Sequence, residues 1–330
     1  MLVLIDAYSQ IFRSFFAIRR LNNSQGEPVN ALFVFTRLLL DIAKKYPSHR
    51  GAMLFDCGKV DFRLKVNPEY KANRPPMPDE LKMQMPWIKE MAEAFGWPLL
   101  SCPDYEADDL AGAFARAEKS DEVRIVSSDK DLSQLVDPRV KLVSPGHGNT
   151  GGFVERGEAE VKEKFGVTPE LIPDYLAIVG DTSDNIPGVP GIGPKGAAEL
   201  LNSCGPIENW IDAPERITIE KYRKKLDGQS ELLRKNLQLV RLRCELPADL
   251  TAPATLDRRD PDYAKIAELC RRFEFNSILR ELPAPPPTPP AEAADDALPL
   301  FSAAPPPEPP AKPEPKTEKP EKTFEQGSLF

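Results

Sequence analysis

Residues 97–131 read WPLLSCPDYEADDLAGAFARAEKSDEVRIVSSDKD and carry two short apolar runs on either side of a helical pattern. The apolar runs are residues 97–100 and 123–126, and the helical spacing covers residues 106–118. A strand followed by a helix and another strand predicts a parallel pair joined by a crossover helix. Because these runs are mostly apolar rather than strictly alternating, with Arg124 as an exception, we expect strands that are buried on both faces.

The same alternation extends toward the amino terminus. Residues 3–5 and 51–55 have the composition of strands, and residues 9–18 and 30–46 have helical patterns. We therefore expect an α/β fold with a central, mostly parallel sheet flanked by helices. In such folds, ligands bind outside the carboxyl ends of the strands.

Acidic side chains follow these predicted strands. Asp6 comes after residues 3–5, Asp56 comes after residues 53–55, and residues 125–128 are followed by two further acids. The full set at this edge is Asp6, Asp56, Asp129 and Asp131 after strands, with Glu106, Asp108 and Asp109 in the first turn of the helix. Because parallel strands end at the same edge of a sheet, we expect these carboxylates to converge.

Local explanations exist for part of this set. Acids at a helix start, such as Glu106 and Asp108, stabilise a helix by about 0.3–1 kcal/mol. Asp129 and Asp131 could lie in a solvated turn. Four separate segments that deliver acids to one edge are harder to explain as caps, and this convergence favours a functional site.

A second informative stretch, residues 179–193, reads VGDTSDNIPGVPGIG. We expect a helix to end near Gly180, followed by a loop with Asp181 and Asp184 and a glycine hairpin over residues 188–193. Pro194 suits the first position of the next helix. Main-chain N–H groups at such a helix start bind phosphate without reading bases, although a simple turn would also use these residues. The candidate DNA contacts are Gly188, Gly191, Ile192, Gly193 and Lys195.

The candidate ligands are all carboxylates. The chain has two histidines, and its five widely spaced cysteines form no Cys-x-x-Cys pair, which disfavours a zinc site or a disulfide framework and suits a reducing compartment. Carboxylate oxygens are preferred by Mg²⁺ and Mn²⁺, and clustered acids need cations to offset their repulsion. Two divalent ions would support the attack of water on a phosphodiester.

Several motifs, taken in chain order, resemble one nuclease family. They are Asp6 with Arg13, FD at 55–56, YKANRPPMP at 70–78, YEADD at 105–109, SDKD at 128–131 and the stretch 179–193. In these motifs, residues 1 to about 280 resemble the 5'-3' exonuclease domain of bacterial DNA polymerase I and its flap-endonuclease relatives. The resemblance implies a PIN-like nuclease domain over residues 1–165, a helical arch at about 68–95, and a helical subdomain with a helix-three-turn-helix over residues 166–282.

The resemblance also implies roles for single residues. Two or more Mg²⁺ or Mn²⁺ ions would be held by Asp6, Asp56, Glu106, Asp108, Asp109, Asp129, Asp131, Asp181 and Asp184. Phosphate would be contacted by Arg13, Lys71 and Arg74, although Arg13 could be a solvated helix residue and the other two a basic loop. The hairpin would grip the duplex backbone and hold a potassium ion on its main-chain carbonyls.

The sequence departs from the family pattern at two places. Ala7 and Ser128 stand where the family usually has glycine, and each adds a small side chain beside an expected ligand that could alter the rate. No carboxylate is missing, so we expect an active enzyme that cuts 5' flaps, nicks and 5' ends of DNA or RNA primers in replication and repair. The alternatives are a non-catalytic DNA-binding module and a single-strand ribonuclease of a related acidic fold.

The last 48 residues differ in composition from the rest. Fifteen of the 36 prolines lie in residues 283–330, and we expect this tail to be disordered. Its end, QGSLF, resembles the peptide by which bacterial replication proteins dock on the sliding clamp, with Gln326, Leu329 and Phe330 as contacts and Gly327 as a departure from the usual leucine. A plain linker or an SH3-type ligand is the alternative.

The net charge of −8 would by itself argue against a nucleic-acid partner. Four of these negative charges belong to the tail, and nine acids belong to the proposed metal site, which leaves a mildly basic remainder. No run approaches the roughly 20 apolar residues of a membrane span. We expect a monomeric, stand-alone nuclease of the bacterial cytoplasm that associates with the nucleoid.

Overall fold

Six strands form one sheet in the computed structural model, which describes residues 1–58, 60–146, 152–250 and 253–283. Their order across the sheet is β3-β2-β1-β4-β5-β6. The strands are β1 (Leu2–Asp6), β2 (Gly51–Leu54), β3 (Leu99–Leu100), β4 (Val123–Val126), β5 (Val140–Pro145) and β6 (Phe153–Arg156). The first five run parallel and β6 is antiparallel to β5, so the prediction of a mostly parallel sheet is confirmed.

The order of the strands places a switch point beside β1. The chain builds outward from β1 to β2 and β3, and then returns to add β4 and β5 on the other side. Asp6 at the end of β1 pairs in register with Leu54 of β2, and Ile5 pairs with Val126 of β4. The residues that follow these three strands therefore meet at one edge, where α/β folds bind their ligands.

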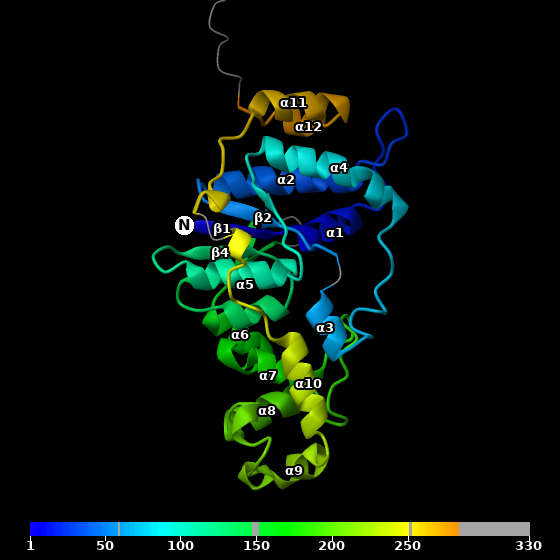
Figure 1. Cartoon of the computed structure of the whole chain (residues 1–330). Helices are drawn as coiled ribbons and strands as arrows, with labels where there is room; N and C mark the ends of the chain where they lie inside the picture. Colours follow the sequence, from blue (N-terminus) through cyan, green and yellow to red (C-terminus); the bar gives the residue numbers. More distant parts are fainter. Residues whose placement is uncertain (59, 147–151, 251–252, 284–330) are drawn as a thin grey trace, which may run out of the picture. The chain divides into compact units, whose positions relative to one another are not determined.

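Helices cover both faces of the sheet, as Figure 1 shows. All five residues of β1 are buried, because alternate side chains enter two different cores. Leu2 and Leu4 pack in a core with α5 (Ala107–Ala117). Val3 and Ile5 pack in the other core with α1 (Ala7–Ala17) and α2 (Asn30–Lys45).

The helix within the expected arch is part of a core. Residues 79–94 form α4 (Asp79–Ala94), which packs against α2 and α11, and its Leu81, Ile88 and Met91 are fully buried. Their spacing is that of a helix with one apolar face. The stretch between the short helix α3 (Asp61–Val66) and α4 carries Lys71 and Arg74, which line the cavity described below.

The carboxyl-terminal half is helical. Its helices are α6 (Glu158–Phe165), α7 (Ile172–Val179), α8 (Pro194–Cys204), α9 (Glu220–Leu226), α10 (Ser230–Val240), α11 (Tyr263–Arg272) and α12 (Asn276–Leu279). Single 3-10 turns are η1 (Asp131–Leu135), η3 (Pro169–Leu171), η4 (Ile207–Asn209), η5 (Pro214–Arg216), η6 (Ala248–Leu250) and η7 (Pro253–Leu256). Residues of α7, α8 and α10 share one apolar core with α5 and the sheet.

No helix among the described residues is both long and apolar enough to span a membrane. The tail with its proposed clamp peptide, Gln326 to Phe330, lies outside the described residues.

Candidate active site

A cavity of about 330 Å³ lies at the carboxyl edge of the sheet. Four carboxylates from four segments line it, and we call them the first carboxylate group: Asp6, Asp56, Asp108 and Asp129. Lys71 and Arg74 line the same cavity. Among the residues that the structure describes, no member of the first group forms an ion pair. The predicted convergence of these acids is therefore found in the structure.

Asp6 and Asp56 each accept a hydrogen bond from the first turn of a helix. Oδ1 of Asp6 accepts a hydrogen bond from the Ser9 amide at 3.1 Å, and Oδ2 accepts one from the Ser127 hydroxyl at 2.8 Å. Oδ1 of Asp56 accepts from the amide of Ala107, the first residue of α5, at 2.7 Å. The capping explanation is thus correct for Asp6, the N-cap of α1, whereas the N-cap of α5 is Glu106. Both sets of hydrogen bonds fix the two carboxylates at the cavity.

Burial and mutual repulsion act on the first carboxylate group. Burial raises the pKa of Asp6 to about 7, and the charges of Asp56 and Asp129 add to this although two hydrogen bonds oppose it. Burial, followed by the charges of Asp129 and Asp6, raises the pKa of Asp108 well above its usual range. Oδ1 of Asp108 is buried without a hydrogen-bond partner. Among the described residues no basic group lies within ion-pair distance of these carboxylates, and the charge of Lys71 offsets only part of the rise at Asp108.

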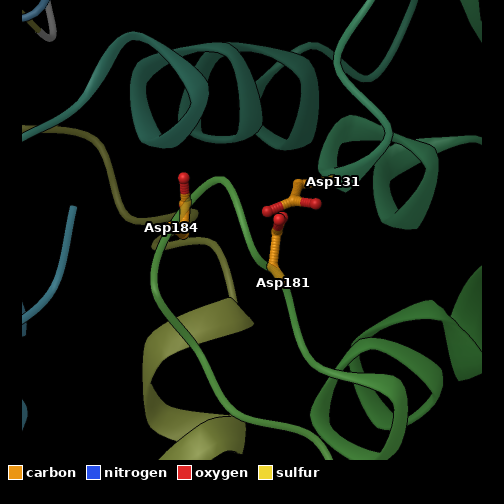
Figure 2. Close-up of side chains that lie close together, drawn as sticks. All are labelled: Asp131, Asp181 and Asp184. Atoms are coloured by element: carbon orange, nitrogen blue, oxygen red, sulfur yellow. The ribbon is translucent and has the colours of Figure 1, made fainter. Parts of the chain in front are cut away.

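A second carboxylate group lies beside the first. It consists of Asp131 at the start of η1, with Asp181 and Asp184 on the loop after α7, and Figure 2 shows how the three side chains approach one another. One oxygen from each lies within 4.8 Å of the others. Oδ1 of Asp131 is buried without a partner, and burial raises the pKa of this carboxyl well above its usual value.

Basic side chains of the protein reach two of these three acids. Nζ of Lys130 lies 3.0 Å from Asp181, and the Arg74 guanidinium lies 2.5 Å from Asp184. Burial alone would raise the pKa of Asp181, but hydrogen bonds from Ser183 and the ion pair with Lys130 lower it below its usual value. The second group is therefore partly neutralised by the chain itself.

Asp109 and Glu106 belong to a buried network around Arg63. The Arg63 guanidinium is 1% exposed and donates two hydrogen bonds of 2.7 Å to Asp109, one of 3.0 Å to Glu106 and one of 3.2 Å to the Leu239 carbonyl. Both oxygens of Asp109 are thus occupied, and a third donor is the Arg243 amide at 2.9 Å. Asp109 is not among the residues that line the cavity, and its expected ligand role stays a prediction.

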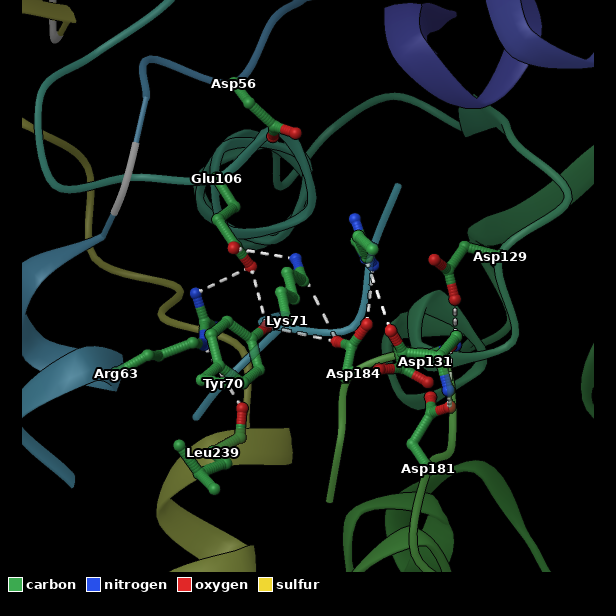
Figure 3. Close-up of polar contacts among 12 residues, drawn as sticks. Asp56, Arg63, Tyr70, Lys71, Glu106, Asp129, Asp131, Asp181, Asp184 and Leu239 are labelled. Atoms are coloured by element: carbon green, nitrogen blue, oxygen red, sulfur yellow. Dashed lines mark hydrogen bonds and ion pairs between the residues drawn. The ribbon is translucent and has the colours of Figure 1, made fainter. Parts of the chain in front are cut away.

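Lys71 links this network to the cavity, as Figure 3 shows. Its Nζ lies 2.7 Å from Oε1 of Glu106 and 3.9 Å from Asp184, and its amide donates to the Asp184 carbonyl at 3.0 Å. The backbone of Lys71 has a φ of 56°, in the left-handed region. The Tyr70 hydroxyl lies 3.1 Å from both Glu106 and Asp184. The loop of the second group therefore holds the segment that carries Lys71.

Arg13 is not brought to the cavity. Its guanidinium donates to the carbonyl of Pro145 at 2.8 Å and to that of Gly146 at 3.4 Å, at the end of β5. Of the three cations proposed to contact phosphate, the structure places only Lys71 and Arg74 beside the carboxylates.

The glycines of the hairpin have different surroundings. A Cβ on Gly188 would lie 2.2 Å from the Val179 carbonyl, so packing against α7 requires glycine there. A Cβ on Gly193 would meet nothing within 4 Å, and Gly193 is the N-cap of α8, which starts at Pro194 as predicted. The Ile192 side chain is 4% exposed and lies in the core.

Of the five candidate DNA contacts, Gly191, Gly193 and Lys195 are exposed. Gly191 has a φ of 78°, which lies in the left-handed region that favours glycine.

Three residues that organise the site were not found from the sequence. Arg63 lies in a short helix whose pattern does not reveal that it is buried. Ser127 is fully buried and joins Asp6 to the amide of Asp129, but a serine at a strand end is common. Lys130 stands between two predicted ligands in the SDKD motif, which was the available signal, yet its contact with Asp181 depends on the tertiary fold.

The donor set fits hard divalent cations. Ten residues line the cavity, its four acids supply carboxylate oxygens, and no histidine or cysteine is among them. The buried, unpartnered oxygens of Asp108 and Asp131 are the kind of atom that a bound ion would satisfy.

Comparisons with known proteins agree with this geometry. The family described as "5'-3' exonuclease, N-terminal resolvase-like domain" matches residues 1–166, and "5'-3' exonuclease, C-terminal SAM fold" matches residues 167–264. The chain belongs to the 5'-3' exonuclease family. This confirms the resemblance and the fold class inferred from the sequence.

Two curated relatives illustrate the range of the 5'-3' exonuclease family. The 5'-3' exonuclease of Aquifex aeolicus is 38% identical over 283 residues, which are 85% of this chain and 94% of that protein. The thermostable DNA polymerase I of Thermus thermophilus is 38% identical over 303 residues, which are 88% of this chain. The chain spans about a third of that polymerase, since the match covers 35% of its length.

Some solved structures that resemble this chain hold metal ions or DNA. A bacteriophage T5 flap endonuclease in a pseudo-enzyme-product complex with DNA and metal ions has a TM-score of 0.60 and 27% identity, and the match covers 83% of this chain and 99% of that one. T5 5'-exonuclease with bound zinc has the same TM-score and identity, over 82% and 98% of the two chains. The catalytic core of Rad2 in complex with a DNA substrate, at 17% identity and a TM-score of 0.56, shares the fold.

Proposed function

We propose that this chain is a Mg²⁺- or Mn²⁺-dependent 5' nuclease that hydrolyses phosphodiesters of DNA and of RNA primers at 5' ends, nicks and flaps. The observation that carries the proposal is the first carboxylate group, which has no basic partner of its own and shares a cavity with Lys71 and Arg74. Anionic oxygens for cations and cationic side chains for phosphate are thus combined in one space. The family and the nuclease names of its relatives support the same reaction.

Within this proposal each group of residues has a distinct task. Both carboxylate groups would hold divalent ions, which when bound supply an acidified water and offset the charge on the phosphate. Lys71 and Arg74 would bind the scissile phosphate, and Arg74 is 46% exposed and accessible to it. Glu106 would orient Lys71 through their 2.7 Å contact. Because Arg63 occupies both oxygens of Asp109, we assign that acid to positioning and not to ion binding.

The proposed duplex contact is the exposed hairpin before α8. Main-chain N–H groups near Gly191 and Gly193, with the ammonium of Lys195, would bind the backbone without reading bases. The proposal keeps the potassium ion implied by the resemblance. The Gly191 carbonyl already accepts from Lys225 at 2.6 Å, so other carbonyls would have to bind the ion. Duplex affinity in KCl, compared with NaCl at equal ionic strength, tests this part.

The remaining parts of the proposal concern organisation. The nuclease domain would comprise residues 1–165 and the DNA-binding subdomain residues 166–282, in a protein that acts as a monomer in replication and repair. A tail ending in Gln326, Leu329 and Phe330 would tether it to the sliding clamp and raise its local concentration on DNA. Unchanged clamp affinity after deletion of residues 326–330 would reduce the tail to a linker.

The central experiment is cleavage of a labelled 5'-flap duplex with Mg²⁺ and with EDTA. We expect cleavage that depends on Mg²⁺ and leaves a 5'-phosphate. Asp108→Asn should retain flap binding and lose cleavage by a factor of about 10³ or more. Asp79→Asn is the control, since Asp79 is exposed on α4 and pairs with Lys82.

The alternative of a non-catalytic DNA-binding module predicts a different result. Tight flap binding without cleavage at any Mg²⁺ or Mn²⁺ concentration would favour that module and contradict the proposed hydrolysis. Preferred cleavage of single-stranded RNA would favour the ribonuclease.

A further inference from the structure

One cation of the site belongs to neither the cavity lining nor the buried Arg63 network. Lys130 lies between Asp129 and Asp131 in the sequence, yet its ammonium contacts the loop after α7, with Nζ at 3.0 Å from Oδ2 of Asp181. Asp181 is a member of the second carboxylate group. The chain thus supplies a monovalent cation to a group for which we propose a divalent one.

We propose that Lys130 is a displaceable counter-ion that neutralises Asp181 in the metal-free protein and leaves it when a divalent ion binds the second carboxylate group. The inference rests on the proposed function, because it concerns an ion at that group. On this inference, the affinity of the second carboxylate group for a divalent ion is set in part by competition with the Lys130 ammonium.

The exposure of the Lys130 side chain gives its ammonium a route into solvent. The Lys130 side chain is 37% exposed, whereas that of Asp181 is 5% exposed. A lysine carries a compact charge on a flexible stem, and solvent can receive it. Arg63 is the opposite case, since it is 1% exposed and fixed by two parallel hydrogen bonds to Asp109.

Asp181 is held in place independently of Lys130. Its Oδ1 accepts hydrogen bonds from the amide of Ser183 at 2.9 Å and from the hydroxyl of Ser183 at 2.6 Å. Only Oδ2 is engaged by the ammonium. Departure of Lys130 would therefore expose one oxygen of a carboxylate that keeps its position, and that oxygen would be available to an incoming ion.

The higher charge of a divalent ion favours it over the Lys130 ammonium at Asp181. A divalent ion and an ammonium cannot both lie against the same carboxylate oxygen without strong repulsion. The second group already offers a buried oxygen without a partner, Oδ1 of Asp131, which an ammonium on Asp181 leaves unsatisfied. A divalent ion can serve both carboxylates at once, so it should replace the lysine, and the lysine should weaken the apparent affinity of that ion.

The test is a titration of the full chain with Mn²⁺ in the absence of DNA. Binding is measured by calorimetry and by the electron paramagnetic resonance signal of free Mn²⁺. We expect two binding constants in the wild type. In Lys130→Met the weaker site should tighten about 10-fold, which is about 1.4 kcal/mol, while the stronger site stays unchanged. Lys130→Gln should behave in the same way, and it provides a second neutral variant if Lys130→Met folds poorly.

Two control variants separate competition from a general loss of charge. Lys130→Arg keeps the cation and should keep the weaker constant near that of the wild type. Lys265→Met removes an ammonium of matched exposure, 36%, that lies 3.1 Å from Glu90 and 3.0 Å from Glu268, on α11. It should change neither constant.

A wild type that binds two ions, with the weaker constant unchanged or weakened in both neutral variants, would overturn the role of Lys130 and leave the proposed function standing. A wild type that binds no Mn²⁺ would overturn both. The thermal midpoint adds a further check. In EDTA it should be lower for Lys130→Met than for the wild type, and at saturating Mn²⁺ the difference should disappear.

Discussion

The two carboxylate groups are neighbours, yet they are stabilised in different ways. Members of the first group are held by neutral donors, such as the amides of Ser9 and Ala107 and the hydroxyl of Ser127. Two members of the second group are held by cations, Lys130 and Arg74. Hydrogen bonds fix a carboxylate without cancelling its charge, so repulsion accumulates in the first group and requires cations from solution. The charges that would bind ions in the first group therefore lower the stability of the metal-free protein.

The largest expected effect separates activity from stability in the first group. Asp6→Asn removes a proposed ligand and one of four repelling charges while it keeps the amide oxygen that caps α1. Cleavage at saturating Mg²⁺ should fall by a factor of about 10³, measured in single turnovers. The free energy of unfolding in EDTA at pH 8 should rise by about 1–2 kcal/mol, because a buried charge is gone.

Asp181→Asn is the matched change in the second group. It should lower the stability of the metal-free protein, since it leaves Lys130 without its partner. If both variants move stability in the same direction, the distinction between the two groups is wrong.

The next largest effect tests whether Asp109 is stabilised by its ion pair with Arg63. Arg63→Met leaves the Asp109 carboxylate buried without a counter-ion and should cost about 3–5 kcal/mol of stability in chemical denaturation. Arg63→Met combined with Asp109→Leu removes both charges and should recover most of this loss. If the single variant is as stable as the wild type, the network is not the support that its geometry indicates.

The pH dependence of stability should report the first group. Burial raises the pKa of Asp6 to about 7 and raises that of Asp129, so the folded protein binds protons more tightly than the unfolded chain. This stabilisation is fully present below about pH 4 and is lost as the pH rises through about 7. In EDTA, the thermal midpoint should therefore fall between pH 5.5 and 8.

Saturating Mg²⁺ should offset this fall, since bound ions stabilise the ionised carboxylates. The gain in the midpoint on adding Mg²⁺ should thus be larger at pH 8 than at pH 5.5. Glu118, whose pKa is lowered to about 2, has completed its titration below this window. An EDTA midpoint that rises from pH 5.5 to 8 would contradict the assignment.

The smallest effect concerns a neutral donor of the first group. Ser127→Ala removes the hydroxyl that donates to Asp6 and accepts from the Asp129 amide, at a cost of about 1 kcal/mol. The Mg²⁺ concentration for half-maximal cleavage should rise by a factor of about 3, measured by titration. Thr36→Ala is the control, because it removes a buried hydroxyl that donates to Leu32 in α2. An equal shift in both variants would indicate general destabilisation.

Some of this site follows from the sequence, because strand ends are visible in it. The alternation of apolar runs and helical patterns predicted the parallel sheet, and a parallel sheet brings Asp6, Asp56 and Asp129 to one edge. The sequence contains no comparable pattern that predicts which charged side chains are buried. Arg63 reads as an ordinary helix residue, and only the tertiary fold places it against α10 and the start of α5.

The expected arch and the hairpin show a second kind of limit. The helical spacing of α4 is clear in the sequence, but the same spacing suits a free helix and a core helix, and only contact with α2 and α11 decides between them. Gly188 and Gly193 look equivalent in the sequence. One is required by close packing against Val179, whereas the other lies beside open space.

The hydrogen bond from the Ala107 amide to Asp56 gives the protein a local spectroscopic reporter. The Asp56 carboxylate follows β2 by two residues, accepts from the first amide of α5 and lines the cavity. An ion bound to this carboxylate would therefore weaken the hydrogen bond and change the chemical shift of the Ala107 amide. The resonance of a single backbone nitrogen should therefore shift as the cavity loads. The rate at which this amide exchanges with deuterium depends on the strength of its hydrogen bond to Asp56. Exchange at the start of α5 should therefore report whether the cavity holds an ion.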